Sequence, residues 1–237
     1  MTKQNRLQGS RGGYPSQAAR RSSRRRHHEL TVRYLVVSEG ELTEPQYFDT
    51  LQPIVEKQFG IQIVNKPGRK RGQRPTGTWK PNPVDVVKKC IEFRDQAERK
   101  SREPGKDVLP YKRCFAVVDY DRWDEGTKPT PLDKAISLSK SEDICLIVSH
   151  VKFEAWVVWH HEHAVPDTDT GRLSKQAEQL GYMDGKNILP AFPLGNFDHA
   201  SKRARRNSNV TCWSKGSNPG TSMPVIFDAL AKDQTEK

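Results

Sequence analysis

The stretch that decides the fold is TVRYLVVSEGELTEPQYF, residues 31–48 of a 237-residue chain. Residues 31–37 form an apolar run rich in β-branched side chains, which predicts a buried strand. A polar corner with a glycine follows, and we expect a helix over residues 43–59. Thr43 can cap that helix and Pro45 suits its first turn.

Glu39 comes directly after the predicted strand, at the carboxyl edge of the expected sheet. Ligands of open α/β sheets collect at that edge. Taken alone, the motif fits either a metal-binding carboxylate or an ordinary turn with solvated acids. The metal interpretation gains weight only where further carboxylates reach the same edge.

Another predicted strand, over residues 111–118, is followed by Asp119 and Asp121. Residues two apart in an extended chain point the same way, and neighbouring strands lie about 4.8 Å apart, so these acids and Glu39 can face one ion. Carboxylates without His or Cys suit Mg²⁺ or Mn²⁺, and such a cluster repels itself unless a cation neutralises it. Ordinary acidic loops remain an equal alternative on spacing alone.

The rest of the pattern alternates strands with helices. Further strands are expected over 61–64 and 144–149, and helices over 82 to about 102–105, 131–140, 152–160, from 173 onward and 222–232. Asn82 and Asn196 suit the caps of two of these helices. The order predicts an α/β fold with a largely parallel sheet flanked by helices, followed by additional C-terminal helices.

Residues 1–28 hold eight of the 40 Lys and Arg residues and no acid, so the other 32 nearly balance the 29 acidic residues. Most of the net charge of +11 therefore belongs to an appended arm that has too little apolar surface to fold alone. A polyanion-binding tail is expected; an organellar transit peptide is the alternative, though amphipathic periodicity is lacking. We divide the chain into this disordered arm, a core over 29–165 and a helical extension over 166–237.

Basic side chains elsewhere are candidate contacts for nucleic-acid phosphates. Residues 66–80, KPGRKRGQRPTGTWK, carry six basic residues and no acid, which predicts a loop, with Trp79 either stacked on a base or packed on the core. A later predicted helix carries basic residues that either contact phosphates or form a solvated face. The candidate contacts are Arg24, Arg25, Arg26, Arg69, Lys70, Arg71, Arg74, Lys202, Arg203 and Arg206.

The four cysteines contain no CxxC pair. Cys114 and Cys145 lie in apolar strand-like runs, where buried reduced thiols are expected, and this predicts a reducing cytoplasm. The sequence has no secretory h-region and no run of about 18 apolar residues, so we expect neither export nor a membrane span.

Four motifs, in order, resemble those of the RloB-like protein family, over residues 31 to 232. They are SEGELTEPQYF at 38–48, VVDYD at 117–121, SHVKFEAWVVWHH at 149–161 and SNPGTSMPVIFDAL at 217–230. The resemblance departs from the family pattern where His150 and Val151 replace an Asn-Pro pair.

The resemblance implies a Toprim-like catalytic fold, in which a Glu follows the first strand and a D-x-D motif follows the third. Topoisomerases, primases and nucleases use that fold on nucleic acid with Mg²⁺. RloB-like proteins are associated with prokaryotic anti-phage defence and abortive infection, often beside an AAA-type ATPase. A metal-dependent nuclease acting on RNA, such as tRNA, or on DNA is therefore expected.

The resemblance assigns roles to individual acids. Glu39, Asp119 and Asp121 would hold Mg²⁺ or Mn²⁺, and Glu154 would join them as a catalytic residue, unless it forms a structural salt bridge. The possible supporting residues are Glu41, Glu44 and His160. Both glutamates also suit the N-terminus of a helix, and the histidines lack a complete set of zinc ligands.

Two other functions compete with the nuclease. One is a non-catalytic nucleic-acid-binding regulator working with an ATPase partner, which metal-dependent turnover by the pure protein would exclude. The other is a primase-type nucleotidyl transferase, which incorporation of labelled nucleotides would reveal.

Overall fold

The computed structural model describes residues 32–67, 82–121, 123–208 and 211–235. These described residues form one compact unit. The arm and most of the basic loop lie outside the described residues, so the phosphate contacts expected there stay predictions. These are Arg24, Arg25, Arg26, Arg69, Lys70, Arg71 and Arg74.

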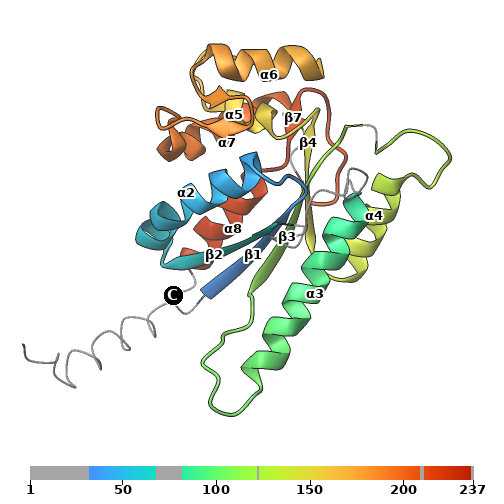
Figure 1. The fold of residues 1–237 in the computed structure, drawn as a ribbon, viewed down its shortest axis with the longest axis vertical. Coiled ribbons are helices and arrows are strands. Elements are labelled where there is room, and N and C mark those ends of the chain that lie inside the picture. Colours follow the sequence, from blue (N-terminus) through green and yellow to red (C-terminus); the bar gives the residue numbers. More distant parts are fainter. Residues whose placement is uncertain (1–31, 68–81, 122, 209–210, 236–237) are drawn as a thin grey trace, which may run out of the picture. The chain divides into compact units, whose positions relative to one another are not determined.

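The centre of the fold is a five-stranded sheet with the order β2-β1-β3-β4-β7 (Figure 1). Its strands are β1 (Val32–Ser38), β2 (Ile61–Pro67), β3 (Arg113–Asp119), β4 (Cys145–His150) and β7 (Gly220–Thr221). The first four are parallel, and β7 pairs antiparallel with β4. This mostly parallel sheet confirms the predicted α/β class and is consistent with a Toprim-like fold.

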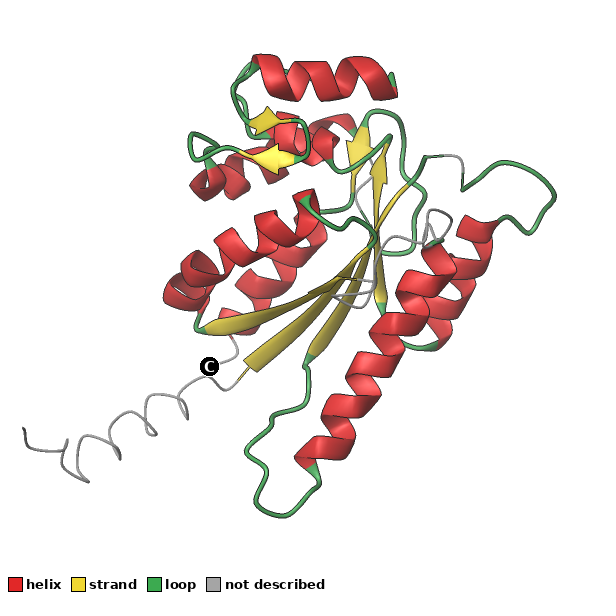
Figure 2. Cartoon of the chain, in the orientation of Figure 1, coloured by secondary structure: helices red, strands yellow, loops and turns green. Residues whose placement is uncertain are grey.

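Helices cover both faces of the sheet (Figures 1 and 2). On one face lie α3 (Pro83–Ser101) and α4 (Pro131–Ser141); α2 (Thr43–Phe59) and α8 (Pro224–Thr235) lie on the other. The alternation of β1 explains this: Tyr34 and Val36 belong to the core under α2 and α8, and Leu35 and Val37 to the core under α3 and α4.

Between β4 and β7 the chain forms a smaller layer of short elements. They are α5 (Glu154–Trp159), α6 (Thr170–Gln179), β5 (Met183–Asp184), β6 (Asn187–Ile188), a 3₁₀ turn at Leu194–Asn196 and α7 (Phe197–Asn207). The hairpin β5–β6 lies where only helical pattern was expected, and β7 lies just past a segment expected to be irregular. Both strands of the hairpin and β7 are two residues long, too short to show a period of two.

Helix starts follow the sequence only in part. Asn82 caps α3 as predicted, since its side chain accepts from Asp85 N at 3.1 Å. The cap predicted at Thr43 is wrong, because Leu42 occupies the N-cap and the Thr43 hydroxyl donates to Lys186 O at 2.9 Å. Asn196 occupies its N-cap position without a capping side-chain bond.

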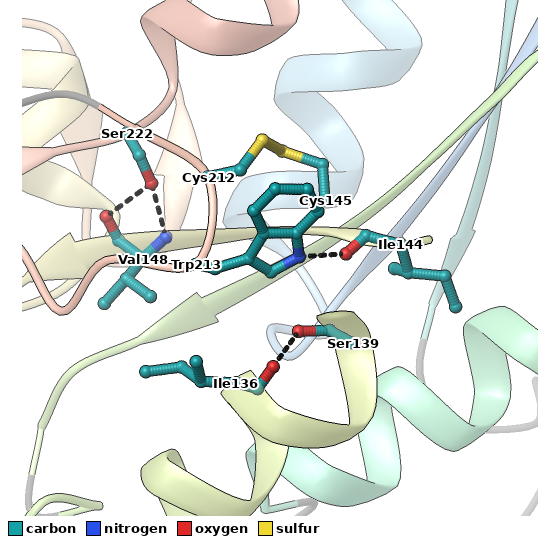
Figure 3. The surroundings of a disulfide bond; sticks show 8 residues. All are labelled: Ile136, Ser139, Ile144, Cys145, Val148, Cys212, Trp213 and Ser222. Carbon is teal, nitrogen blue, oxygen red and sulfur yellow. Dashed lines mark hydrogen bonds between the residues drawn. A yellow bond between two sulfur atoms is a disulfide. The ribbon is translucent and has the colours of Figure 1, made fainter. Parts of the chain in front are cut away.

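Cys145 is bonded to Cys212 in a disulfide, with Cα atoms 5.3 Å apart (Figure 3). The expectation of a reduced thiol at Cys145 is therefore wrong, because the segment before β7 lies beside the first residue of β4. Cys114 and Cys90 are free and buried, as expected for Cys114.

Candidate acidic site

Glu39 directly follows β1 and contacts the end of the neighbouring strand β3. β1 and β3 are parallel neighbours, and Glu39 N continues their ladder by donating to Val117 O at 2.9 Å. The Glu39 carboxylate then accepts from Asp119 N at 3.2 Å and from Trp123 Nε1 at 3.0 Å. The Glu39 carboxylate is thus held against the backbone of Asp119, as the strand tips predicted.

Glu44 turns back from the first turn of α2 toward the same corner. It is 5% exposed, and its carboxylate accepts from Gly40 N at 3.1 Å. A Cβ atom at Gly40 would lie 1.9 Å from Glu44 Oε2. The motif therefore needs glycine at position 40, because the Glu44 carboxylate fills the space of a side chain.

Glu154 reaches the corner from the start of α5. Its Oε1 atom lies 4.0 Å from Lys152 Nζ, which also donates to Ser174 Oγ at 2.7 Å. The charge of Glu154 raises the pKa of both Glu44 and Asp119, so the three side chains are close enough to repel one another. We call Glu39, Glu44, Asp119 and Glu154 the acid cluster.

The electrostatics of the acid cluster reflect burial first and repulsion second. Burial raises the pKa of Glu39 to about 7, against the opposing hydrogen bonds from Asp119 N and Trp123. Burial, with the charge of Glu154, raises the pKa of Glu44 to about 7. The pKa of Asp119 lies well above its usual range because of burial and the charges of Glu44 and Glu39.

The chain does not stay extended from Asp119 to Asp121, as the sequence suggested it would. The strand ends at Asp119, and Tyr120 N donates to Ser149 O at 2.8 Å. Asp121 is exposed with φ of 33°, and its N–H donates to Val151 O at 3.2 Å. The expectation of an extended chain that points both aspartates the same way is therefore wrong. Asp121 lies at the rim, where its charge still raises the pKa of Glu39.

The donor set of the acid cluster fits a hard divalent cation by type and by charge. Among the residues that the structure describes, no three His, Cys, Asp or Glu side chains converge at ligating distance. Mg²⁺ is usually held by only one or two carboxylates and keeps several waters, so it does not need a cage of protein ligands. The ligand set Glu39, Asp119 and Asp121 stays a prediction.

His160 lies inside the core. It is 2% exposed, its Nδ1 atom is 3.0 Å from Trp156 O, and its ring contacts Phe192. Burial lowers the pKa of His160 to about 3, so the ring is neutral. Glu41 is exposed.

The basic residues of α7 divide into two groups. Arg203 donates to Trp159 O at 2.8 Å and His160 O at 3.0 Å, so it satisfies the C-terminal carbonyls of α5. Arg205 pairs with Asp228. Lys202 and Arg206 are exposed. Of the three phosphate contacts predicted here, Arg203 is thus engaged within the fold.

Trp123 and Lys186 are two residues at the site that the sequence did not indicate. Trp123 holds the Glu39 carboxylate, and the positive charge of Lys186 lowers the pKa of Glu44. A tryptophan four residues after Asp119 has no distinctive spacing. Lys186 lies in the turn of the β5–β6 hairpin, which the sequence did not reveal.

Comparison with known proteins identifies one family. The family model described as RloB-like protein matches residues 34–230. No curated protein and no solved structure matches the chain. Within the described ranges, none of the helices has the length and apolar character needed to cross a membrane.

Proposed function

The chain belongs to the RloB-like protein family, and we propose that it is a metal-dependent nuclease that cleaves phosphodiester bonds of RNA or DNA in anti-phage defence. One observation carries the proposal: four carboxylates, from the residue after β1, the last residue of β3, α2 and α5, lie close enough to influence one another's pKa at the carboxyl edge of a mostly parallel sheet. This edge is where open α/β sheets place their ligands.

Asp119 and Glu39 are the residues proposed to hold Mg²⁺ or Mn²⁺, with Glu44 and Glu154 beside them. A bound divalent cation polarises a phosphate and stabilises the charge that develops during phosphodiester cleavage. Glu39, whose pKa is about 7, is suited to exchange a proton near neutral pH. Trp123 fixes the orientation of the Glu39 carboxylate, and Lys186 supplies a positive charge beside Glu44.

Nucleic acid is the proposed substrate because the chain carries a net charge of +11, concentrated in the arm and the 66–80 loop. Such charge supplies sequence-independent attraction to phosphates. An AAA-type ATPase partner and a cytoplasmic location belong to the same proposal.

The test is incubation of the full chain with total cellular RNA and with plasmid DNA, in Mg²⁺, in Mn²⁺ and in a chelator. Cleavage that needs the metal and disappears in Asp119→Asn is expected. The matched control is Glu125→Gln, which changes an exposed acid outside the acid cluster. Cleavage that persists in Asp119→Asn would show that the acid cluster does not perform it.

A second candidate, a nucleic-acid-binding regulator without catalysis, is favoured by one observation. The described acids include no group of three at ligating distance. Retention of nucleic acid without cleavage in either metal, with or without the ATPase partner, would select this alternative.

A further inference from the structure

Residues 211–222, which we call the strap, lie beside β4 on the side away from β3. Cys212 is bonded to Cys145 at the start of β4, and Trp213 N donates to Leu146 O at 3.2 Å. The strap then continues to the end of β4 and returns as β7, where Gly220 pairs with His150. Figure 3 shows the disulfide next to Trp213, whose indole donates to Ile144 O at 2.7 Å.

The far end of the strap reaches the edge that holds the acid cluster. Lys215 pairs with Asp124 and Asp133, and Asp124 accepts from Tyr120 OH at 2.9 Å. Thr221 Oγ1 lies 2.8 Å from Ser149 Oγ, and Ser149 is the residue of β4 opposite Asp119. The strap therefore connects the disulfide at one end of β4 with the neighbours of Asp119 at the other.

The disulfide borders a cavity of about 410 Å³ at the amino ends of β3 and β4. Both bonded cysteines are half-buried, and Trp213 and Val225 line the same space. A thiol–disulfide exchange needs access of an attacking sulfur along the S–S axis. The cavity and the partial exposure of the two sulfur-bearing residues supply a route for a small molecule.

We propose that Cys145–Cys212 is a thiol–disulfide exchange site that a small thiol enters through this cavity, and that its redox state fastens or releases the strap. A thiolate attacks one sulfur of the bridge, forming a mixed disulfide and releasing the other cysteine as a thiolate, which takes a proton. A second thiol attacks the mixed disulfide. Two thiols are thereby oxidised to one disulfide, and the protein gains two electrons and two protons. The inference does not rest on nuclease activity.

Reduction removes the one covalent bond of the strap to β4. The bridge joins residues 67 apart in the sequence, so its loss returns freedom to a long loop. Near the bridge the strap then keeps the two hydrogen bonds of Trp213. The rate of trypsin cleavage after Lys215 measures how freely the strap opens. Trypsin can cut there only when the Lys215 side chain leaves its ion pairs with Asp124 and Asp133.

The experiment compares the full chain in an oxidised buffer with the same protein treated with dithiothreitol or glutathione under native conditions. Alkylation after denaturation, read by intact mass, should label Cys90 and Cys114 in the oxidised protein and all four cysteines after treatment. Trypsin cleavage after Lys215, identified by the fragment that begins at Gly216, should accelerate roughly tenfold or more on reduction, as local opening becomes easier.

Cys114→Ser is the matched control, since it removes a free thiol and keeps the bridge. It should respond to dithiothreitol as the wild type does, whereas Cys145→Ser/Cys212→Ser should be cut rapidly in both buffers. Four labelled cysteines in the oxidised wild type would overturn the proposal. Equal cleavage at Lys215 in oxidised and reduced wild type, both shown folded by circular dichroism, would also overturn it, whether or not the double variant folds.

Discussion

Gly40 and Glu44 are fitted to each other: the amide of Gly40 donates to the Glu44 carboxylate at 3.1 Å, and no Cβ atom fits between them. The corner after β1 is thus built around a buried carboxyl group. This explains physically why a glycine and a glutamate occur together in the stretch that opens the fold.

We expect Gly40→Ala to displace the Glu44 carboxylate and to destabilise the protein by about 1–3 kcal/mol, the usual cost of overpacking. The matched control is Gly195→Ala, because a Cβ atom there meets nothing within 4 Å. Urea unfolding of the two variants measures the difference. A Gly40→Ala variant as stable as Gly195→Ala would show that Glu44 has room to move elsewhere.

The acid cluster predicts an unusual pH dependence of stability. Glu44 titrates near 4.5 when unfolded and near 7 when folded, so the folded protein holds the extra proton between these values. Stability should therefore fall as pH rises from about 5 to 7, by on the order of 2–3 kcal/mol for this residue. Thermal unfolding without metal measures the fall.

Glu44→Gln should flatten this fall of stability with pH, while Glu56→Gln, which changes an exposed acid of α2, should not. Added Mg²⁺ should stabilise the wild type most at high pH, where the carboxylates are charged. A slope unaltered by Glu44→Gln would remove this residue as its source.

A separate buried carboxylate anchors α8 to the sheet. Asp233 is 1% exposed and accepts from Tyr34 OH at 2.6 Å and from Arg113 Nη2 at 2.8 Å, with Lys112 Nζ 3.1 Å away. These partners hold the pKa of Asp233 below its usual range against the effect of burial. The ionised Asp233 therefore stabilises the folded protein above about pH 4, and this stabilisation is lost as the pH falls through the lower pKa that Asp233 has in the folded state.

We expect Asp233→Asn to destabilise the protein by about 2–4 kcal/mol at neutral pH, because Arg113 and Tyr34 lose their charged acceptor. Arg113 is 34% exposed at its side chain, which keeps the cost below that of a fully buried pair. The stability of the variant should also fall less than that of the wild type when the pH is lowered, because the variant has no carboxylate to protonate at this position. Asp228→Asn, on the exposed side of α8, is the control in the same urea titration.

Lys186 should matter to the proposed cleavage although it lies 147 residues after Glu39 in the sequence. Thr43 Oγ1 donates to its carbonyl oxygen, and Gln46 fixes the next two residues through Asn187 Oδ1 at 3.1 Å and Ile188 N at 2.9 Å. Lys186→Met should lower kcat/KM by about tenfold, equivalent to about 1.4 kcal/mol. Lys175→Met, at an exposed position of α6, should not change it.

Much of the fold could be predicted because it is local. The bounds of α2 and the cap of α3 follow from apolar spacing, Pro45 and Asn82 within a few residues of sequence. The β5–β6 hairpin and β7 could not be predicted, because a strand of two residues is too short to show an alternating pattern of apolar and polar side chains. The disulfide could not be either, because its two cysteines are 67 residues apart and meet only through the pairing of β7.

The acid cluster was predictable in part for the same reason. The tips of parallel strands bring Glu39 and Asp119 together, as spacing suggested. The approach of Glu44 and Glu154 depends on how α2 and α5 pack on the sheet, and only the family motif pointed to them. The end of the strand was predicted to within one residue, but the turn after it was not: Asp121 has a positive φ, so it does not point the same way as Asp119.

The arm at residues 1–28 is expected to bind nucleic acid without taking part in the chemistry. Deleting it removes eight Lys and Arg residues and none of the described core, so the rest should still fold. Each lost phosphate contact flattens the slope of log affinity against log salt by about 0.9 on duplex DNA, or about 0.7 on single strands.

If half of the arm's charges touch phosphate, the slope should flatten by roughly three to four units. Binding should weaken most at low salt, while single-turnover cleavage with excess protein should survive at saturation, because the acid cluster begins at Glu39. Salt titrations of binding with both forms of the chain measure the slope. An unchanged slope would assign the arm to a protein partner instead, and loss of saturated cleavage would place the arm within the active site.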